Sequence, residues 1–377
     1  MKARIDYTNV PEALRGMYQL EHYIPPISTR SDSMRIAVLG AGGGLGRNVV
    51  DAARAAKHDV VALVRDPKRA ELPDDVTTVV GDATHVDDVV RAMAGADATM
   101  FCVNPPFATW LTTFPPLLAC AIAAARKTNT RLVFPANVWI YGPGRAGELV
   151  AETRAPAPTS QRGKLRAEME QQIRAAGIRY AIVRLPEFYG PNVVSVPAGV
   201  FQAALADRRA LWPGSLDVAV ELVYIPDAGR AMVTVAAAAD CDGATFHLPG
   251  ARTTPRQFVE LVYQAAGRKP RAFGVPRWVL STAGVFDANV RGVADIAHLW
   301  THPILLDGAK YSARFGAIPL TPLADAIATT LAWHRAHPAF RLPSALNVAT
   351  SRHASTQRRV PSRNRRFNVL GSQKGVN

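Results

Sequence analysis

A hydroxyl group and an amine stand four residues apart in the stretch PTSQRGKLRAEME, which covers residues 158–170. Ser160 and Lys164 would point the same way from a helix, because side chains four positions apart share one helix face. A serine beside a lysine can act as a nucleophile in acyl transfer. The same two residues can equally be a helix cap and a solvated lysine. The choice between these readings depends on what the rest of the chain builds around them.

A glycine-rich loop, GAGGGLGRNVV at residues 40–50, follows the first strongly apolar run. Its spacing is G-x-x-G-x-x-G with two extra glycines, and a leucine takes the last glycine position of the G-x-G-x-x-G pattern. Gly40 permits a tight turn, Gly43 lets the backbone approach a pyrophosphate, and Gly46 lets a helix pack closely on the sheet. The order of strand, loop and helix therefore predicts a dinucleotide site. Its predicted contacts are Gly40, Gly42, Gly43, Gly44, Leu45 and Gly46.

Charges of both signs follow the second apolar run, in ALVRDPKRA at residues 62–70. An Asp or Glu about twenty residues past the loop would bind the ribose hydroxyls of NAD. Here Arg65 stands directly before Asp66, and a guanidinium beside the ribose favours a 2′-phosphate. The sequence therefore favours NADP(H) as cofactor, and Asp66 keeps NAD(H) open.

Short, nearly continuous apolar runs alternate with helix-like segments from residue 35 onward. We expect strands at 35–39, 59–64, 76–80, 98–103, 131–135 and 180–185, and helices at 45–57, 86–95, 113–127 and 163–176. Such runs suit strands that are buried on both faces of a parallel sheet. The alternation predicts an α/β fold with a Rossmann-like doubly wound parallel sheet, in which ligands bind at the carboxyl ends of the strands.

Changes in the pattern of apolar runs and in composition divide the chain into four segments. Residues 34–190 form the predicted NAD(P)-binding Rossmann domain. Residues 191–341 read as a smaller, mostly helical substrate region that is partly interleaved with that domain, with helices at 254–267 and 322–337. Residues 1–33 are an N-terminal extension without the apolar core of a signal peptide, and disorder is one reading of it. Residues 342–377 are polar, carry basic residues and no acid, and read as a disordered basic tail.

Composition excludes several classes of protein. The net charge is +14, and because half of it lies in the tail, a solvated extension explains it better than nucleic-acid binding. Three widely spaced cysteines and no compact His/Asp/Glu cluster argue against a disulfide scaffold and against a metal site. The longest apolar run, LLACAIAAA at 117–125, is too short to span a bilayer. We therefore expect a cytoplasmic protein with a small-molecule substrate.

Further motifs follow the loop in a fixed order. They are VRDPKR, GDATHVDDVVRAM (81–93), VWIYGPG (138–144), Lys164, RLPEFYGP (184–191) and VYIPDAGRAMV (223–233). In this order they resemble the extended and atypical short-chain dehydrogenases/reductases, the NAD(P)-dependent epimerase/dehydratase group. The resemblance covers roughly residues 34–340. It implies an oxidoreductase or epimerase-like enzyme that acts on a carbonyl or hydroxyl of a small organic substrate or a nucleotide sugar.

The resemblance also implies which residues surround the cofactor. Asp82 and Ala83 would lie by the adenine, and Lys164 would hold the nicotinamide ribose. The segment after the fourth strand would line the cofactor, and two residues after the sixth would approach the nicotinamide. These further positions are Val103, Asn104, Pro105, Pro186 and Phe188.

Both hydroxyl groups of the catalytic set of this family are replaced. The family uses a Tyr-x-x-x-Lys pair with a Ser or Thr, and the tyrosine passes a proton to or from the substrate oxygen. Ser160 stands at the tyrosine position and Asn137 at the Ser/Thr position, four before Tyr141. An alkanol is far less acidic than a phenol, so Ser160 cannot simply inherit the proton transfer. Asn137 can still donate a hydrogen bond to a developing oxyanion.

Three sources for the missing proton stay open. Tyr141 or Tyr189 could supply a phenol from another direction, Glu187 could act as an acid if burial raises its pKa, or Lys164 could act alone. The predicted catalytic residues are thus Lys164, Asn137 and Tyr141. The alternative is a redox sensor or regulatory protein that binds NADP(H) without turnover, since such a protein has no need of the tyrosine.

An apolar row on the lysine-bearing helix raises the question of a partner. Leu165, Met169 and Ile173 are spaced four apart in LRAEMEQQI. Extended members of the resembling family often form dimers through this helix. The row is consistent with a homodimer, and equally with packing on the chain's own sheet.

Overall fold

The computed structural model of the protein describes residues 33–342 except 284, 286–287 and 319. Nearly all of the N-terminal extension and of the basic tail lies outside these residues. Their predicted disorder therefore stays a prediction.

A seven-stranded parallel sheet forms the centre of the molecule, in the order β11-β7-β5-β4-β1-β2-β3. The order reverses between β1 and β4, which is the switch point of a doubly wound sheet. The predicted Rossmann-like fold is confirmed, and only the edge strand β11 was not expected. The strands are β1 (Arg35–Leu39), β2 (Asp59–Val64), β3 (Thr77–Val80), β4 (Ala98–Phe101), β5 (Arg131–Asn137), β7 (Tyr180–Leu185) and β11 (Ala244–His247).

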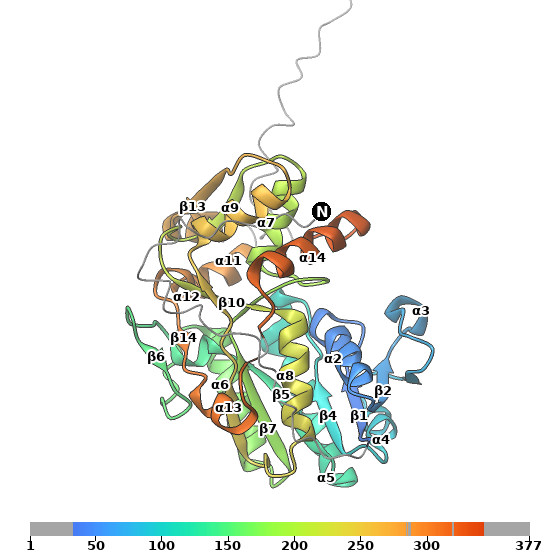
Figure 1. Cartoon of the computed structure of the whole chain (residues 1–377). Coiled ribbons are helices and arrows are strands. Elements are labelled where there is room, and N and C mark those ends of the chain that lie inside the picture. Colours follow the sequence, from blue (N-terminus) through green and yellow to red (C-terminus); the bar gives the residue numbers. More distant parts are fainter. Residues whose placement is uncertain (1–32, 284, 286–287, 319, 343–377) are drawn as a thin grey trace, which may run out of the picture.

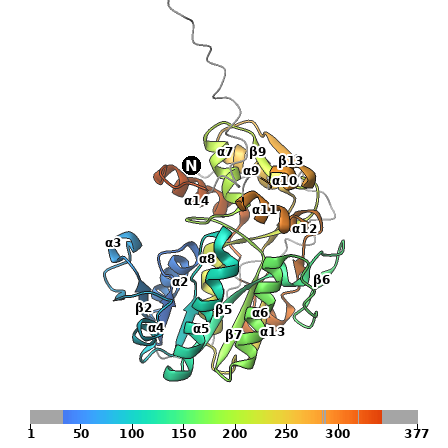
Figure 2. The ribbon, with the colours of Figure 1, turned by 180° about the vertical axis from the view of Figure 1, so that it is seen from behind.

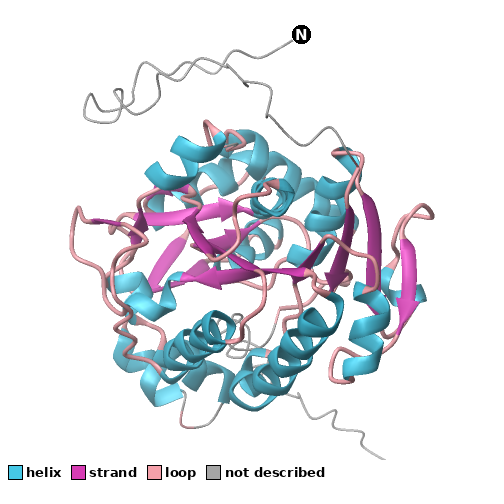
Figure 3. Ribbon diagram, turned by 90° about the horizontal axis from the view of Figure 1, so that it is seen from below, coloured by secondary structure: helices cyan, strands magenta, loops and turns pink. Residues whose placement is uncertain are grey.

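Helices cover both faces of this sheet. α2 (Gly44–Ala55) and α8 (Ile225–Ala237) lie on the face seen in Figure 1, and α4 (Val86–Met93), α5 (Trp110–Thr128) and α6 (Gln161–Ala175) lie on the face seen in Figure 2. Each set closes its own apolar core against the sheet. Figure 3 shows the strands between these two helical layers. The short helix α3 (Pro67–Ala70) follows β2 at the surface, and α13 (Ala309–Phe315) packs beside β11.

A smaller, mostly helical region lies over one end of the sheet (Figure 1). Its helices are α7 (Val196–Leu205), α9 (Pro255–Ala265), α10 (Arg277–Ala283), α11 (Ala288–Asp295), α12 (His298–Thr301) and α14 (Leu323–Ala336). Its short strands are β8 (Glu187–Tyr189), β10 (Val220–Tyr224) and β12 (Ala251–Thr253) in one sheet, β9 (Ala210–Pro213) with β13 (Ala272–Val275), and β6 (Leu149–Val150) with β14 (Leu305–Leu306). β7 ends at Leu185, and β8 of the smaller region begins at Glu187. The smaller region therefore lies at the carboxyl ends of the strands of the large sheet.

One helix is more apolar than the sequence run at 117–125 suggested. The segment 107–128 is 22 residues long, and an 18-residue window within it has a mean hydropathy of 1.5, which is enough by length and composition for a membrane-spanning helix. Within this segment, Phe114, Leu118 and Ile122 are buried in the core beneath the sheet. Arg126 donates to the carbonyl oxygen of Ala176 at the end of α6. One face of the segment thus packs on the sheet, and 33% of the apolar window is buried.

The apolar row on α6 is explained by the same core. Leu165, Met169 and Ile173 are all buried against the sheet. The row therefore packs on the chain's own sheet and gives no support to a dimer.

Candidate functional site

The glycine-rich loop makes a tight turn between β1 and α2. Gly40 has φ +84°, in the left-handed region, and a Cβ there would lie 2.8 Å from the backbone of Cys102. A Cβ on Gly46 would lie only 2.1 Å from the carbonyl oxygen of Gly40. Gly43 is the N-cap of α2 and offers no side chain to its first-turn amides. These amides have no acceptor within the helix, so the loop presents the positive helix end to an anion and fits a pyrophosphate.

The two charged residues after β2 differ in how they are engaged. Oδ1 of Asp66 accepts hydrogen bonds from the backbone N–H groups of Lys68 at 3.0 Å and Arg69 at 3.4 Å, and thereby caps α3. Arg65 is exposed, and within the described part of the chain its guanidinium forms no hydrogen bond or ion pair. The acid is thus used by the turn, whereas the guanidinium is available to a ligand.

The predicted adenine residues lie in an ordered turn after β3. Oδ1 of Asp82 accepts from the backbone N–H and the hydroxyl of Thr84 at 2.9 and 2.8 Å, and these bonds lower the pKa of Asp82. The N–H of Asp82 donates to Oδ2 of Asp88 at 2.8 Å. Ala83 packs against the core of the α4–α5 face. Residues 103–105 follow the carboxyl end of β4, where the carbonyl of Pro105 accepts from the indole of Trp110 at 3.0 Å.

Asn137 ends β5, and its main chain is held by a buried ion pair. Nη1 of Arg184 donates to the Asn137 carbonyl at 2.8 Å, while the same guanidinium makes two bonds of 2.8 Å to the carboxylate of Glu170. The Asn137 side-chain oxygen accepts from the N–H of Trp139 at 3.2 Å and caps the 3-10 helix η2 (Val138–Tyr141). Its Nδ2 donates to no other described residue. Asn137 therefore keeps a free amide donor at the carboxyl edge of the sheet.

Tyr141 lies in the core, not at an open face. It is 1% exposed, and its hydroxyl lies 2.8 Å from Nε2 of His247, whose Nδ1 lies 2.9 Å from the carbonyl of Val150. A carbonyl only accepts, so Nδ1 carries the hydrogen and Nε2 accepts from the tyrosine. Burial raises the pKa of Tyr141, and burial with the nearby Arg184 charge lowers the pKa of His247 to about 3. This arrangement disfavours Tyr141 as a proton donor to a substrate.

Ser160 and Lys164 open helix α6. The hydroxyl oxygen of Ser160 accepts from the N–H of Gly163 at 2.9 Å, and this N-cap is 1% exposed. A Cβ on Gly163 would lie 2.6 Å from the carbonyl oxygen of Trp139, so this glycine lets α6 approach η2 closely. Lys164 is exposed next to this contact, and its side chain makes no hydrogen bond or ion pair with another described residue. The serine is therefore a structural cap, and only the lysine remains available.

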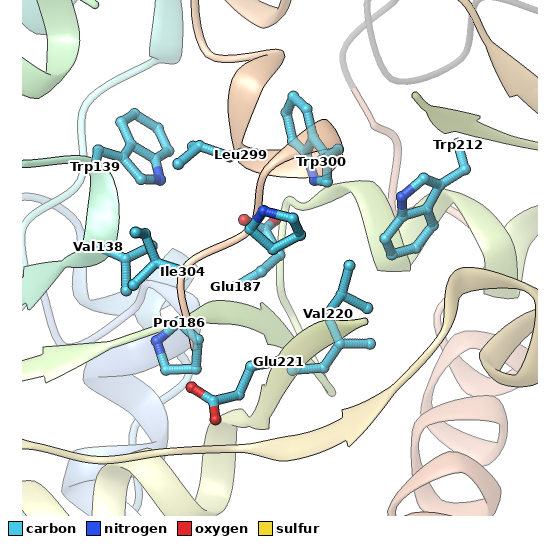
Figure 4. A pocket seen from close by; sticks show the side chains of 12 residues that line it. Val138, Trp139, Pro186, Glu187, Trp212, Val220, Glu221, Leu299, Trp300 and Ile304 are labelled. Carbon is cyan, nitrogen blue, oxygen red and sulfur yellow. The ribbon is translucent and has the colours of Figure 1, made fainter. Parts of the chain in front are cut away.

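A pocket lies where β5 and β7 enter the smaller region (Figure 4). It is small, with a cavity volume of about 30 Å³, and it is partly open to solvent. Trp139, Leu299 and Trp300 border it on one side and Pro186 and Glu221 on the other, with Glu187 between them in the view of Figure 4. The full lining is Val138, Trp139, Pro186, Glu187, Trp212, Val220, Glu221, Leu222, Leu299, Trp300, Pro303 and Ile304.

Two carboxyl groups of the pocket have raised pKa values. Burial raises the pKa of Glu187 to about 7, although a hydrogen bond from the backbone of Val196 opposes the shift. Burial likewise raises the pKa of Glu221 to about 7, opposed by hydrogen bonds from Leu306 and Arg252. Those two bonds, both 3.0 Å, occupy both oxygens of Glu221. Glu187 is thus the acid in the pocket that is not tied to a basic side chain.

Sequence reasoning identified Glu187 only as one option among three and missed Glu221 and His247. A lone acid within the apolar run VAVELVY was the available signal for Glu221. Nothing local marked His247, because its partner Tyr141 is more than a hundred residues away. Within the described ranges, no group of three His, Cys, Asp or Glu side chains could hold a metal ion.

The comparisons with known proteins agree with this geometry. Residues 40–196 match the NAD(P)H-binding protein family, so this part of the chain is an NAD(P)H-binding domain. The resemblance to the short-chain dehydrogenases/reductases drawn from the ordered motifs is confirmed. The replacement of the tyrosine and of the Ser/Thr is read from this chain's own sequence and stays a prediction.

Individual relatives include reductases and epimerases. The chain is 28% identical over 282 residues to the 2′-dehydrokanamycin reductase of Streptomyces kanamyceticus, and this alignment covers 70% of this chain and 75% of that protein. It is 27% identical over 220 residues to a 3-diazoavenalumate denitrifying reductase of a Streptomyces species, covering 53% and 71%. Its fold matches the UDP-glucose 4-epimerase of Thermus thermophilus in complex with NAD, with a TM-score of 0.63, 19% identity, and coverage of 80% and 99%.

Proposed function

We propose that the protein is an NADP(H)-dependent oxidoreductase that acts on a carbonyl or hydroxyl group of a small organic substrate. One observation carries this proposal: the glycine loop, Asn137 and Glu187 stand at the carboxyl ends of the parallel strands β1, β5 and β7. Asn137 pairs with Leu185 across β5 and β7, and Glu187 stands two residues beyond Leu185. The reductases among the relatives support the reductive direction.

The preference for NADP(H) rests on the turn after β2. Because Asp66 caps α3, one of its oxygens is already used, and the exposed Arg65 offers a fork of donors for a 2′-phosphate. In the same proposal Lys164 holds the nicotinamide ribose, since its side chain is exposed beside η2 and has no partner among the described residues. The loop residues around Gly43 hold the pyrophosphate.

Glu187 takes the place of the missing phenol in this proposal. The cofactor, when bound, supplies the hydride for the carbonyl carbon. The Asn137 amide donates a hydrogen bond to the carbonyl oxygen and stabilises the charge that develops there. The protonated Glu187 carboxyl then gives its proton to that oxygen and regains one from solvent. A pKa of Glu187 of about 7 keeps much of the carboxyl protonated at neutral pH.

Two measurements test the proposal. Purified protein is titrated with NADPH and NADH by cofactor fluorescence, and turnover is then followed by nicotinamide absorbance with aldehydes, ketones and nucleotide sugars. Glu187→Gln should lower kcat while leaving NADPH affinity unchanged. Glu221→Gln is the matched control, because it removes a carboxyl of the same pocket and should leave the pH profile of kcat in place.

The other candidate is a sensor that binds NADP(H) without turnover. The buried Ser160 cap at the tyrosine position favours it, because the usual proton donor is absent. Tight NADPH binding without turnover on any substrate class would support the sensor over the enzyme. No binding of either cofactor would contradict both.

A further inference from the structure

Basic residues gather where the chain enters the paired strands β9 and β13 of the smaller region. The two strands run parallel, so the segments that lead into them lie side by side. The N–H of Ala210 donates to the carbonyl oxygen of Arg271 at 2.8 Å, and the hydroxyl of Tyr263 donates to the carbonyl oxygen of Arg208. At the other end of β13, α10 begins with a further arginine. This basic patch consists of Arg208, Arg209, Arg268, Lys269, Arg271 and Arg277, which are all exposed.

Little negative charge lies within the basic patch. Arg271 donates to the carboxylate of Asp207 and is thereby neutralised. The side chains of the other five basic residues form no hydrogen bond or ion pair within the described part of the chain. No Asp or Glu occurs in the sequence from residue 261 to residue 285. A surface with this excess of positive charge attracts anionic partners.

Large apolar side chains are exposed beside these charges. Phe273 lies on β13 two residues after Arg271 and is 48% exposed. Trp278 lies in the first turn of α10, which begins two residues after β13 ends, and is 69% exposed. Val285 follows α10 and is 67% exposed. The elements β9, β13 and α10 lie together at the end of the smaller region away from the large sheet (Figure 2). Apolar side chains gathered in this way mark an interaction surface.

The charge of the chain itself disfavours its own segments as the partner. Residues 343–377 carry basic residues and no acid, so the basic patch repels them. Residues 1–32 contain equal numbers of basic and acidic residues and offer no complementary charge. A second copy of the chain, with a net charge of +14, is repelled as well.

Among anionic partners, a lipid surface matches both properties of this face. A nucleic acid supplies phosphates, and its bases stack on aromatic rings, but an aliphatic side chain such as Val285 gains nothing from stacking. The boundary of a bilayer takes up tryptophan, phenylalanine and aliphatic side chains, and anionic head groups attract lysine and arginine.

We propose that this face of the smaller region binds the surface of a membrane that contains anionic lipids. The basic patch contacts the head groups, and the rings of Phe273 and Trp278 enter the layer between head groups and acyl chains. No residue of this face belongs to the glycine loop or to the lining of the pocket. The inference is therefore independent of the proposed function, and turnover without membrane binding, or the reverse, distinguishes the two.

The test is co-sedimentation of the full chain with vesicles. The vesicles contain phosphatidylcholine alone, or phosphatidylcholine with an equal share of phosphatidylglycerol. We expect binding to the anionic vesicles to be at least about tenfold tighter than to the neutral ones and to weaken as salt is added. Equal binding to both kinds of vesicle, or none to the anionic ones, would overturn the inference.

Two variants separate this face from the basic C-terminal segment, which stays in place in both. Lys269→Ser should weaken binding to the anionic vesicles roughly fivefold, and Arg145→Ser, which removes an exposed charge elsewhere, is the matched control and should have little effect. Trp278→Ser should weaken binding about tenfold or more while leaving its salt dependence unchanged. All three positions are exposed, so the melting temperature should stay close to that of the wild type.

The same variants expose the alternative partners. Unchanged vesicle binding in both Lys269→Ser and Trp278→Ser would assign the binding to the C-terminal segment and overturn the inference. A single-stranded oligonucleotide is titrated in parallel by fluorescence anisotropy. If it binds more tightly than the anionic vesicles and loses affinity in both variants, this face is a nucleic-acid site and not a membrane site.

Discussion

The side-chain oxygen of Ser160 lies 2.9 Å from the backbone nitrogen of Gly163, and this hydrogen bond begins helix α6. The hydroxyl oxygen of the serine at the tyrosine position therefore already accepts a hydrogen bond from the first turn of α6. The reading of Ser160 and Lys164 as a nucleophilic pair loses its support, since a buried cap cannot reach a substrate. In the proposed reaction the proton would come from Glu187 in the pocket.

Removing the cap should affect stability and not chemistry. Ser160→Ala should lower the free energy of unfolding by about 1 kcal/mol, because one first-turn amide loses its acceptor. Urea unfolding measures this change. Ser195→Ala is a matched control, since Ser195 caps α7 with a bond of 3.2 Å to the N–H of Ala198. Both variants should keep turnover, and a selective loss of kcat in Ser160→Ala would instead assign the hydroxyl to the reaction.

The pocket acids predict how stability depends on pH. The pKa of Glu187 rises from 4.5 to about 7 on folding, so the native state holds a proton that the unfolded chain has lost. The contribution of Glu187 to the free energy of unfolding is fully present below about pH 4.5. It is lost as the pH rises to about 7, and the loss is on the order of 3 kcal/mol at most. Glu221 acts in the same window.

Glu187→Gln should therefore reduce the slope of unfolding free energy against pH between 4.5 and 7. The remaining slope belongs to Glu221, and denaturant unfolding at several pH values measures both. Reductive kcat/KM of the wild type should fall above about pH 7, because the acid form of Glu187 is then depleted. An unchanged slope in Glu187→Gln would mean that this carboxyl does not titrate as described.

The sequence predicted the central sheet well and the substrate side poorly, for physical reasons. β1, β2 and β7 have the expected bounds, because strands buried on both faces are continuous apolar runs. The glycine loop could also be predicted from the sequence, since its backbone geometry requires glycine. The Glu187 pocket and the Tyr141–His247 contact join segments far apart in the chain, so no local pattern encodes them.

Cofactor preference should follow Arg65. Arg65→Asp removes the guanidinium and adds a charge that repels a 2′-phosphate, so NADPH affinity should fall roughly tenfold or more relative to NADH. Fluorescence titration with both cofactors measures the ratio. Lys68→Ala is the control, because Lys68 is exposed on α3 next to the same turn. Equal effects of the two changes would point to general charge and not to a specific contact at Arg65.

The buried ion pair behind Asn137 should be costly to break. Glu170→Gln leaves the buried Arg184 guanidinium without its counter-charge, and we expect a loss of about 3–5 kcal/mol in unfolding free energy. The exposed pair of Arg256 and Asp217 is the control, where Asp217→Asn should have little effect. Calorimetry and urea unfolding check both. Equal stabilities of the two variants would show that the pair does not hold the main chain of β5.

The close contact inside the glycine loop gives the most local prediction. In Gly46→Ala the new Cβ would lie 2.1 Å from the carbonyl oxygen of Gly40 and 2.9 Å from Cα of Ala41. Both neighbours are backbone atoms, so the start of α2 must move away from β1 and carry its first-turn amides with it. NADPH affinity should then fall by more than about tenfold, because the anion site depends on the position of that helix end.

Gly177→Ala separates this effect from a general loss of stability. Gly177 has φ +64°, and a Cβ added there would meet nothing within 4 Å, so the change strains the backbone far from the loop without a steric clash. It should lower the melting temperature and leave NADPH affinity unchanged. If Gly46→Ala retains its affinity for NADPH at equal or lower stability than Gly177→Ala, the glycine loop is a turn alone, and the pyrophosphate must bind elsewhere.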